Sequence, residues 1–146
     1  MNIDKLREEI EADEGCKYEI YLDHLGLPTF GIGHLVLDID PEYGEEVGTP
    51  VSEDRVSACF DRDVHTVLSE CERLYEDFSS LPEDVQRIIA NMMFNMGYPR
   101  LSKFKGMKAG VDARDWNQAA DEMVDSVWYR QVTNRADRLV ERMRRI

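Results

Sequence analysis

The first apolar stripe of the chain has the spacing of one helical face. Its members are Ile3, Leu6 and Ile10. Gly15 follows, and a glycine at such a position can end a helix. The pattern therefore predicts an N-terminal helix over about residues 3–12 that places Glu14 at its C-terminal edge.

The period changes in the next segment. Residues 18–37 contain β-branched and aromatic side chains in short runs, separated by the turn-like sequence Asp23-His24-Leu25-Gly26. Such runs favour strands, so the segment predicts a small antiparallel sheet. Residues 38–52 hold two prolines, two glycines and mostly polar side chains, which indicates an irregular connection.

Helical spacing returns at Ser52, a residue type that often caps helices, and continues over about residues 53–78. A second apolar stripe runs from Val85 to Met96 and is preceded by Ser80 and Glu83 at capping-box spacing. Two further amphipathic segments cover residues 112–124 and 133–145.

These elements predict an α+β fold that is mostly α. The length suits one compact domain over residues 1–146 or two small lobes that share a core. The first lobe, about 12–52, holds the small sheet, and a connecting helix of about 53–78 follows. The second lobe, about 80–146, is helical and packs with the N-terminal helix.

Charge is unevenly distributed along the 146 residues. The chain carries 18 basic and 30 acidic side chains, for a net charge of −12. Residues 1–97 have 7 basic and 23 acidic side chains, whereas residues 98–146 have 11 and 7. Binding to nucleic acid through bulk charge is disfavoured, because phosphate contacts need Lys and Arg. The C-terminal part is expected to carry a basic patch.

The sequence shows neither a signal peptide nor an apolar run of membrane-spanning length, so we expect the chain to stay in the cytosol unless something releases it. Cys16, Cys59 and Cys71 are odd in number and lack the CxxC pairs typical of zinc sites. They are expected to be free thiols. Asp38, Asp40 and Glu42 have the spacing of a calcium loop, but Tyr43 stands where the tight turn needs glycine.

Glu14, Asp23 and Thr29 form the sharpest candidate constellation, where a helix end meets a small sheet. Cleavage of a glycosidic bond needs a protonated acid on the leaving oxygen and a second carboxylate that activates water or attacks the sugar. The alternative is structural: Glu14 solvates its helix end, and Asp23 makes an Asx-turn with its neighbours.

Several ordered motifs resemble those of the T-even phage lysozymes, glycoside hydrolase family 24. They are Glu14-Gly15, Tyr21-Leu22-Asp23, Thr29, Gly31-Ile32-Gly33-His34-Leu35, Asn91 to Gly97, Trp116 with Ala119-Ala120, Trp128 to Gln131, and Asn134-Arg135-Ala136 with Arg138. The resemblance covers about residues 3–140. It implies a two-lobed lysozyme-like fold.

The resemblance also implies a reaction. Glu14 is the expected general acid, and Asp23 and Thr29 are expected to hold the attacking water on the opposite face of the sugar. The bond cleaved would be the β-1,4 link between N-acetylmuramic acid and N-acetylglucosamine in peptidoglycan, with inversion and without metal or cofactor. Inversion requires the two carboxyl groups to lie about 6.5–9.5 Å apart.

Other roles are carried over position by position. Leu35 and Phe94 match sugar-facing positions, and Tyr21 and Asn95 belong to motifs near the site. Arg135 is expected to pair with Glu14. His34 is expected to pair with Asp63 in the run Phe60-Asp61-Arg62-Asp63-Val64. Met107 and Glu122 depart from the family, which tends to place small polar contacts there.

The resemblance further implies an endolysin that waits in the host cytoplasm and reaches the wall in the periplasm when a holin opens the membrane. We expect a monomer with no nucleic-acid partner and no stable membrane association. Two alternatives remain. One is a lysozyme-like protein that binds peptidoglycan without cutting it, and the other is an acidic mimic of nucleic acid.

Overall fold

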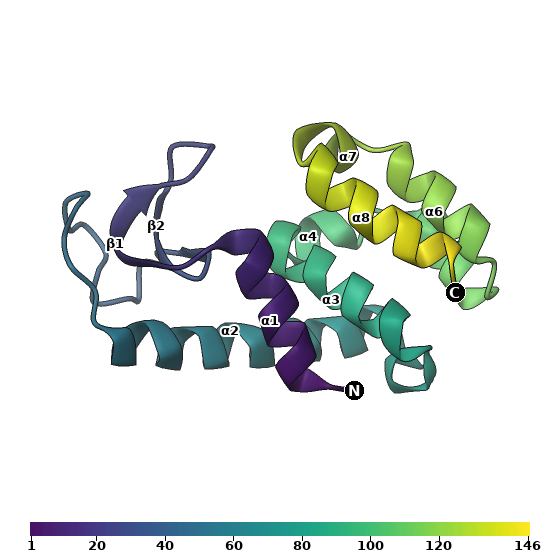
Figure 1. Ribbon diagram of the computed structural model, residues 1–146, viewed down its shortest axis with the longest axis horizontal. Helices are drawn as coiled ribbons and strands as arrows, with labels where there is room; N and C mark the ends of the chain where they lie inside the picture. Colours follow the sequence, from purple (N-terminus) through teal and green to yellow (C-terminus); the bar gives the residue numbers. More distant parts are fainter. The chain divides into compact units, whose positions relative to one another are not determined.

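The computed structural model describes all 146 residues. It is mostly helical with one small antiparallel sheet, as the sequence predicts (Figure 1). The chain divides into two compact units. Arg7–Thr66 form the N-terminal unit, and Met1–Leu6 with Val67–Ile146 form the C-terminal unit. Helices α1 (Ile3–Glu14) and α2 (Glu53–Leu74) each contribute residues to both.

The N-terminal unit contains the sheet, with strands β1 (Lys17–Leu22), β2 (Pro28–Gly31) and β3 (His34–Leu35). Their order is β1-β2-β3, and both pairings are antiparallel. Apolar side chains beneath the sheet meet the first half of α2. The buried ones include Ile20, Phe30, Ile32, Val56, Phe60 and Val64. Three of the four residues of β2 are buried.

Helix α2 begins as the sequence predicts, because the Ser52 hydroxyl accepts a hydrogen bond from the Arg55 backbone N–H at 3.1 Å. It ends at Leu74, about four residues earlier than expected. After Leu74 the chain tightens: the Phe78 N–H donates to the carbonyl oxygen of Tyr75, and a short 3₁₀ helix, η1, covers Phe78–Ser80. Tyr75 and Phe78 are both buried there.

The C-terminal unit consists of short helices around α3. These are α3 (Glu83–Met96), α4 (Tyr98–Leu101), α5 (Lys105–Asp112), α6 (Trp116–Val124), α7 (Val127–Gln131) and α8 (Thr133–Arg144). Helix α3 contributes the largest share of the core. Its fully enclosed side chains include Val85, Ile88, Ile89, Met92 and Met93. Helix α6 contacts α5, α7 and α8.

Two helix starts differ from the sequence prediction. The capping box from Ser80 to Glu83 does not form, and α3 begins at Glu83 after Pro82. A residue that precedes proline is driven out of the helical region, and Leu81 is extended at ψ 153°. The helix expected over 112–124 is interrupted by Arg114 at φ 58°, so α6 begins only at Trp116, where Asp115 caps it.

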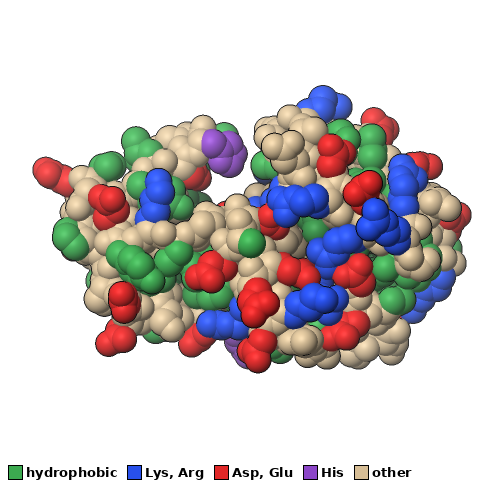
Figure 2. Space-filling view, in the orientation of Figure 1, with side chains coloured by type: hydrophobic (Ala, Val, Ile, Leu, Met, Phe, Trp, Pro, Cys, Tyr) green, Lys and Arg blue, Asp and Glu red, His purple; other side chains and the backbone are tan.

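On the face drawn in Figure 2, basic side chains of the C-terminal unit are interspersed with acidic ones. Arg142 of α8 pairs with Asp84 at 2.5 Å, and Arg144 pairs with Asp121 at 2.7 Å. These ion pairs weaken the basic patch expected there. No helix of the chain is both long enough and apolar enough to cross a membrane.

Gly110→Ala is expected to lower the free energy of unfolding by about 1–3 kcal/mol. A Cβ at Gly110 would lie 2.6 Å from the backbone nitrogen of Ala119, which α6 holds in place. Gly106→Ala is the control in the same helix, because its new Cβ would meet only the mobile carboxylate of Glu122. Urea unfolding of both variants checks this, and equal stabilities would contradict it.

Candidate active site

Glu14 occupies the C-terminal end of α1, where the chain turns toward β1. Gly15 takes φ 75°, and its N–H donates to the carbonyl oxygen of Glu11 at 2.8 Å. The Glu14 side chain lies against the α-carbon of Gly33, because a Cβ added there would be 2.7 Å from Glu14 Oε1. Gly33 also has φ 61°, a conformation that favours glycine. Both features of Gly33 therefore support the observed position of Glu14.

Asp23 lies at the turn between β1 and β2. Its Oδ1 accepts hydrogen bonds from the backbone N–H groups of Leu25 at 2.8 Å and Leu27 at 2.9 Å. The Asx-turn considered for this residue is thus present. Both bonds use Oδ1, so Oδ2 is the oxygen that remains for a water molecule. A structural and a chemical role are compatible in one side chain.

Thr29 pairs with Tyr21 of β1 on one side and with Leu35 of β3 on the other. Its hydroxyl donates to the carbonyl oxygen of Leu27 at 3.0 Å and is left with lone pairs that can accept from water. Thr29 is buried, whereas the Leu35 side chain is 43% exposed. An apolar surface therefore borders the Thr29 hydroxyl.

Tyr21 connects the two candidate carboxylates electrostatically. Its pKa is raised, first because the phenol is partly buried and then because the negative charges of Glu14 and Asp23 disfavour a phenolate. The ammonium group of Lys17 lies 4.4 Å from the centre of its ring. Both carboxylates therefore contribute to the raised pKa of Tyr21. The expected carboxyl separation stays a prediction.

His34 donates from both ring nitrogens to carboxylates. Nδ1 bonds Asp63 Oδ2 at 2.7 Å, so the pair predicted from the sequence forms, and Nε2 bonds Asp40 Oδ2 at 2.7 Å. Asp40 also accepts from the Leu37 N–H at 2.8 Å and pairs with Arg55, which in turn binds Glu42. This network joins β3, the following loop and α2.

The partners of His34 decide its charge. Burial opposes protonation, but hydrogen bonds with Asp63, Cys59 and Asp40 outweigh it and raise the pKa of His34 to about 10. Asp40 is likewise buried, yet its bonds to His34 and Leu37 hold its pKa below the ordinary value. The imidazole is therefore a charged structural group at neutral pH.

Sequence reasoning missed Asp40 and Arg55. The sequence pattern places Asp40 only in a calcium-loop spacing and does not single out Arg55. The signal available was an acidic residue six positions after His34, a spacing that becomes a contact only because the loop turns back on β3. The proximity of Gly33 to Glu14 is a second feature that no sequence motif specified.

The C-terminal unit holds the remaining expected site residues. Asn95 accepts a hydrogen bond from the indole N–H of Trp128 at 2.7 Å, and Phe94 beside it is half-buried. Arg135 is buried and donates from Nε to Asn91 Oδ1 at 2.8 Å. The pairing of Arg135 with Glu14 stays a prediction.

A pocket of about 470 Å³ opens in the same unit. It is lined by Phe104 and Trp128, whose rings lie 6.4 Å apart in an edge-on arrangement, and by Met107 and Glu122. Met107 is fully enclosed at 0% exposure, so its side chain fills the core. Glu122 is exposed, and its carboxylate lies against Gly106. Met107 and Glu122, the two positions at which the sequence departs from the family, therefore both line this pocket.

The fold and the candidate residues are compatible with one class of enzyme. A mostly helical α+β chain with a helix-terminal Glu, a turn Asp and a neighbouring Thr has the groups that a glycoside hydrolase needs.

Comparison with known proteins identifies the family. A model of the family described as phage lysozyme matches residues 11–145. Probable T4-type lysozymes 2 and 1 of Dictyostelium discoideum are each 27% identical over 94% of this chain and 92% of their own length. The pre-baseplate central spike protein Gp5 of Enterobacteria phage T4 is 28% identical over 92% of this chain, which spans 26% of that protein. The chain belongs to the phage lysozyme family and is a glycoside hydrolase.

Asp63→Asn is expected to lower the free energy of unfolding by about 1.5–3 kcal/mol, the range for hydrogen bonds to charged groups. The pKa of His34 is raised to about 10, so this stabilisation is fully present below about pH 6.5 and is lost as pH rises toward 10. It also weakens at acid pH, where Asp40, whose pKa is held below its ordinary value, becomes protonated.

Urea unfolding of wild type and Asp63→Asn at pH 5.5, 8 and 10 measures this difference. The stability gap between the two proteins should be largest at pH 5.5 and smallest at pH 10. Arg55, Glu42 and Cys59 also lie close to the network. Their contributions to stability are shared by wild type and Asp63→Asn, so they cancel in the difference between the two proteins at each pH. A gap that does not change with pH would contradict a charged His34.

Proposed function

We propose that this chain hydrolyses the β-1,4 bond between N-acetylmuramic acid and N-acetylglucosamine in bacterial peptidoglycan, with inversion at the anomeric carbon. One observation carries the proposal: the Glu14 side chain lies against Gly33 in the turn between β2 and β3, the two strands that pair at Thr29, and backbone N–H groups hold Asp23 in the turn that precedes β2. Membership of the phage lysozyme family supports it.

Each residue has a distinct part in the proposed reaction. Glu14 donates a proton to the glycosidic oxygen as the bond to the anomeric carbon breaks. Asp23 and the Thr29 hydroxyl hold a water molecule on the other face of the sugar, and that water attacks the anomeric carbon. Asp23 takes up the proton which the water loses. Glu14 and Asp23 then exchange protons with solvent to restore the starting state.

Sugar binding is assigned to apolar side chains with exposed surface. Leu35 borders Thr29 in the N-terminal unit, and Phe94 is the candidate in the C-terminal unit. The CH faces of a glycan pack on such surfaces while its hydroxyl groups bond to polar ones. Arg135 and Asn95 are proposed as positioning residues, since both are held by hydrogen bonds inside their own unit.

The proposed setting is lysis of a host cell from within. A holin would release the enzyme from the cytoplasm to the wall, and the enzyme would act as a monomer on peptidoglycan. The alternative is a lysozyme-like protein that binds peptidoglycan without cutting it. The presence of Glu14, Asp23 and Thr29 in the chain favours the enzyme, because a pure binding protein has no need of all three.

Glu14→Gln is expected to lower kcat/KM on purified peptidoglycan by at least about 10²–10⁴-fold, because an amide cannot donate the proton. The measurement is the release of reducing ends, together with clearing of outer-membrane-permeabilised cells. Glu11→Gln is the matched control, since Glu11 is exposed on the same helix.

The two possible failures differ. If the wild type binds peptidoglycan in a pull-down but does not cleave it, the chain is a peptidoglycan-binding protein and not an enzyme. If Glu14→Gln still cleaves peptidoglycan, the chain is a lysozyme whose general acid is a residue other than Glu14.

Gly33→Ala is expected to reduce activity about 100-fold, the cost of a misplaced catalytic group. The new Cβ would lie 2.7 Å from Glu14 Oε1 and would push the carboxylate away. Gly48→Ala is the control, because Gly48 also has positive φ, at 92°, but no atom lies within 4 Å of its added Cβ. Turnover per folded molecule compares them. Equal loss in both variants would show backbone strain rather than displacement of Glu14.

A further inference from the structure

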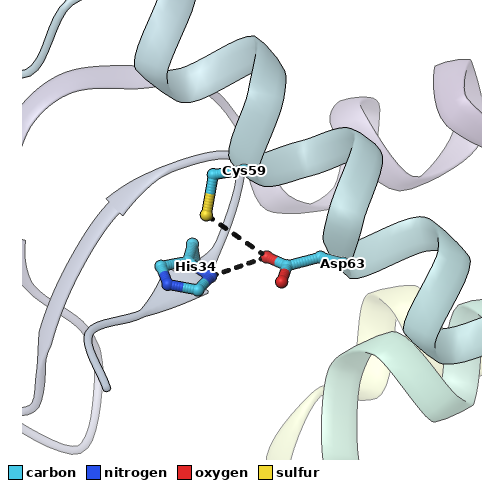
Figure 3. A group of neighbouring side chains, drawn as sticks. All are labelled: His34, Cys59 and Asp63. Carbon is cyan, nitrogen blue, oxygen red and sulfur yellow. Dashed lines mark hydrogen bonds and ion pairs between the residues drawn. The ribbon is translucent and has the colours of Figure 1, made fainter. Parts of the chain in front are cut away.

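Three side chains with metal-binding atoms converge beside the sheet of the N-terminal unit. His34 comes from β3, and Cys59 and Asp63 lie one turn apart on α2 (Figure 3). Their potential ligand atoms, Nδ1, Sγ and a carboxylate oxygen, all lie within 4.8 Å of one another. His34 and Cys59 are buried, and the Asp63 side chain is 23% exposed.

These are the ligand types that zinc prefers. Zinc binds thiolate sulfur, imidazole nitrogen and carboxylate oxygen with tetrahedral geometry, and sites with three protein ligands hold water at the fourth position. A thiolate, a carboxylate and a neutral imidazole balance the two positive charges of the ion. Because His34 and Cys59 are buried, a neutral site avoids the cost of an unpaired charge there.

The histidine already has the outer contact of a metal ligand. Its Nε2–H donates to Asp40, and Asp40 is itself held by the Leu37 N–H and by Arg55. Histidines that bind metals usually donate their second ring N–H to a carboxylate in this way, which fixes the orientation of the ring. Asp40 therefore keeps Nδ1 directed toward α2 without help from Asp63.

We propose that His34 Nδ1, Cys59 Sγ and the Asp63 carboxylate form a zinc site that cross-links β3 to α2. The ion takes the place of the proton shared between His34 and Asp63. The protons of Nδ1 and of the Cys59 thiol pass to solvent, and the remaining coordination position takes a water molecule. The site is structural, and the proposed hydrolysis does not use it.

Two of the three ligand separations already lie close to those of a zinc site, and the third, from Nδ1 to Sγ, is at most 4.8 Å. Bond lengths of about 2.0–2.2 Å to nitrogen and oxygen place tetrahedral ligands about 3.4 Å apart. Asp63 Oδ2 lies 2.7 Å from Nδ1 and 3.9 Å from Sγ. The carboxylate must therefore move away from the imidazole and toward the sulfur by a few tenths of an ångström to about 0.7 Å. Asp63 is the most exposed of the three ligands.

The other cysteines provide a contrast. Cys71 is buried on the same helix, where burial raises the pKa of its thiol, and Cys16 is half-buried at the start of β1. Neither belongs to the cluster of potential ligands. A thiol-dependent metal signal that needs Cys59 but neither Cys16 nor Cys71 would therefore report this site.

The test uses the full chain, treated with a chelator and then freed of it. Cobalt(II) added to this protein should give tetrahedral d–d absorption and a near-ultraviolet thiolate-to-cobalt band, and one equivalent of zinc should abolish both. Zinc should also raise Tm, whereas magnesium, which prefers oxygen ligands, should not. Cys59→Ser should remove the thiolate band, and Cys71→Ser and Cys16→Ser should keep it.

A second variant tests the outer contact. Asp40→Asn should weaken zinc binding by about 10–100-fold in competition with a chromophoric chelator, as expected for loss of a histidine-orienting carboxylate. Absence of the cobalt bands in wild type would overturn the proposal, and so would bands that survive in Cys59→Ser. Because Cys59→Ser leaves the bonds from His34 to Asp63 and Asp40 intact, we expect it to fold.

Discussion

The N-terminal unit depends on the imidazolium of His34, which donates one hydrogen bond to Asp40 and one to Asp63. A sheet of three short strands has little core of its own and needs a partner to be stable. The bond to Asp63 attaches β3 to α2, and the bond to Asp40 closes the loop after β3 over the same helix. Burial makes the charge costly, and two carboxylates repay that cost by holding the pKa of His34 near 10.

Gly33 links the contacts of His34 to the proposed active site. Gly33 precedes His34, and its α-carbon lies against the carboxylate of Glu14. The segment that fixes the histidine therefore also positions the surface on which the proposed acid rests. The neighbouring strand β2 brings Thr29 beside Tyr21, and the turn before it holds Asp23 through Oδ1. Stability and the proposed reaction share the same short segments of backbone.

Sequence patterns along the chain predict most of the helices, and single residues explain where those predictions were wrong. The apolar stripes before Gly97 and after Thr133 identify α3 and α8 because each buries one face over several turns. Predictions failed where one residue changed the backbone. Pro82 moved the start of α3, and Arg114 with positive φ separated α5 from α6. The short helices α4 and α7 were missed, because segments of four or five residues show no helical period. The eight-residue helix α5 was missed as well.

The sequence by itself determined the fold class, the family motifs and the identity of Glu14, Asp23 and Thr29 as candidates, because these depend on spacing along the chain. It also indicated the pair of His34 and Asp63. Only the tertiary structure brought Asp40 and Cys59 to the same histidine and placed Gly33 beneath Glu14. Those contacts join residues from a loop, a strand and two helices. Their distances follow from how the elements pack, for which no local pattern exists.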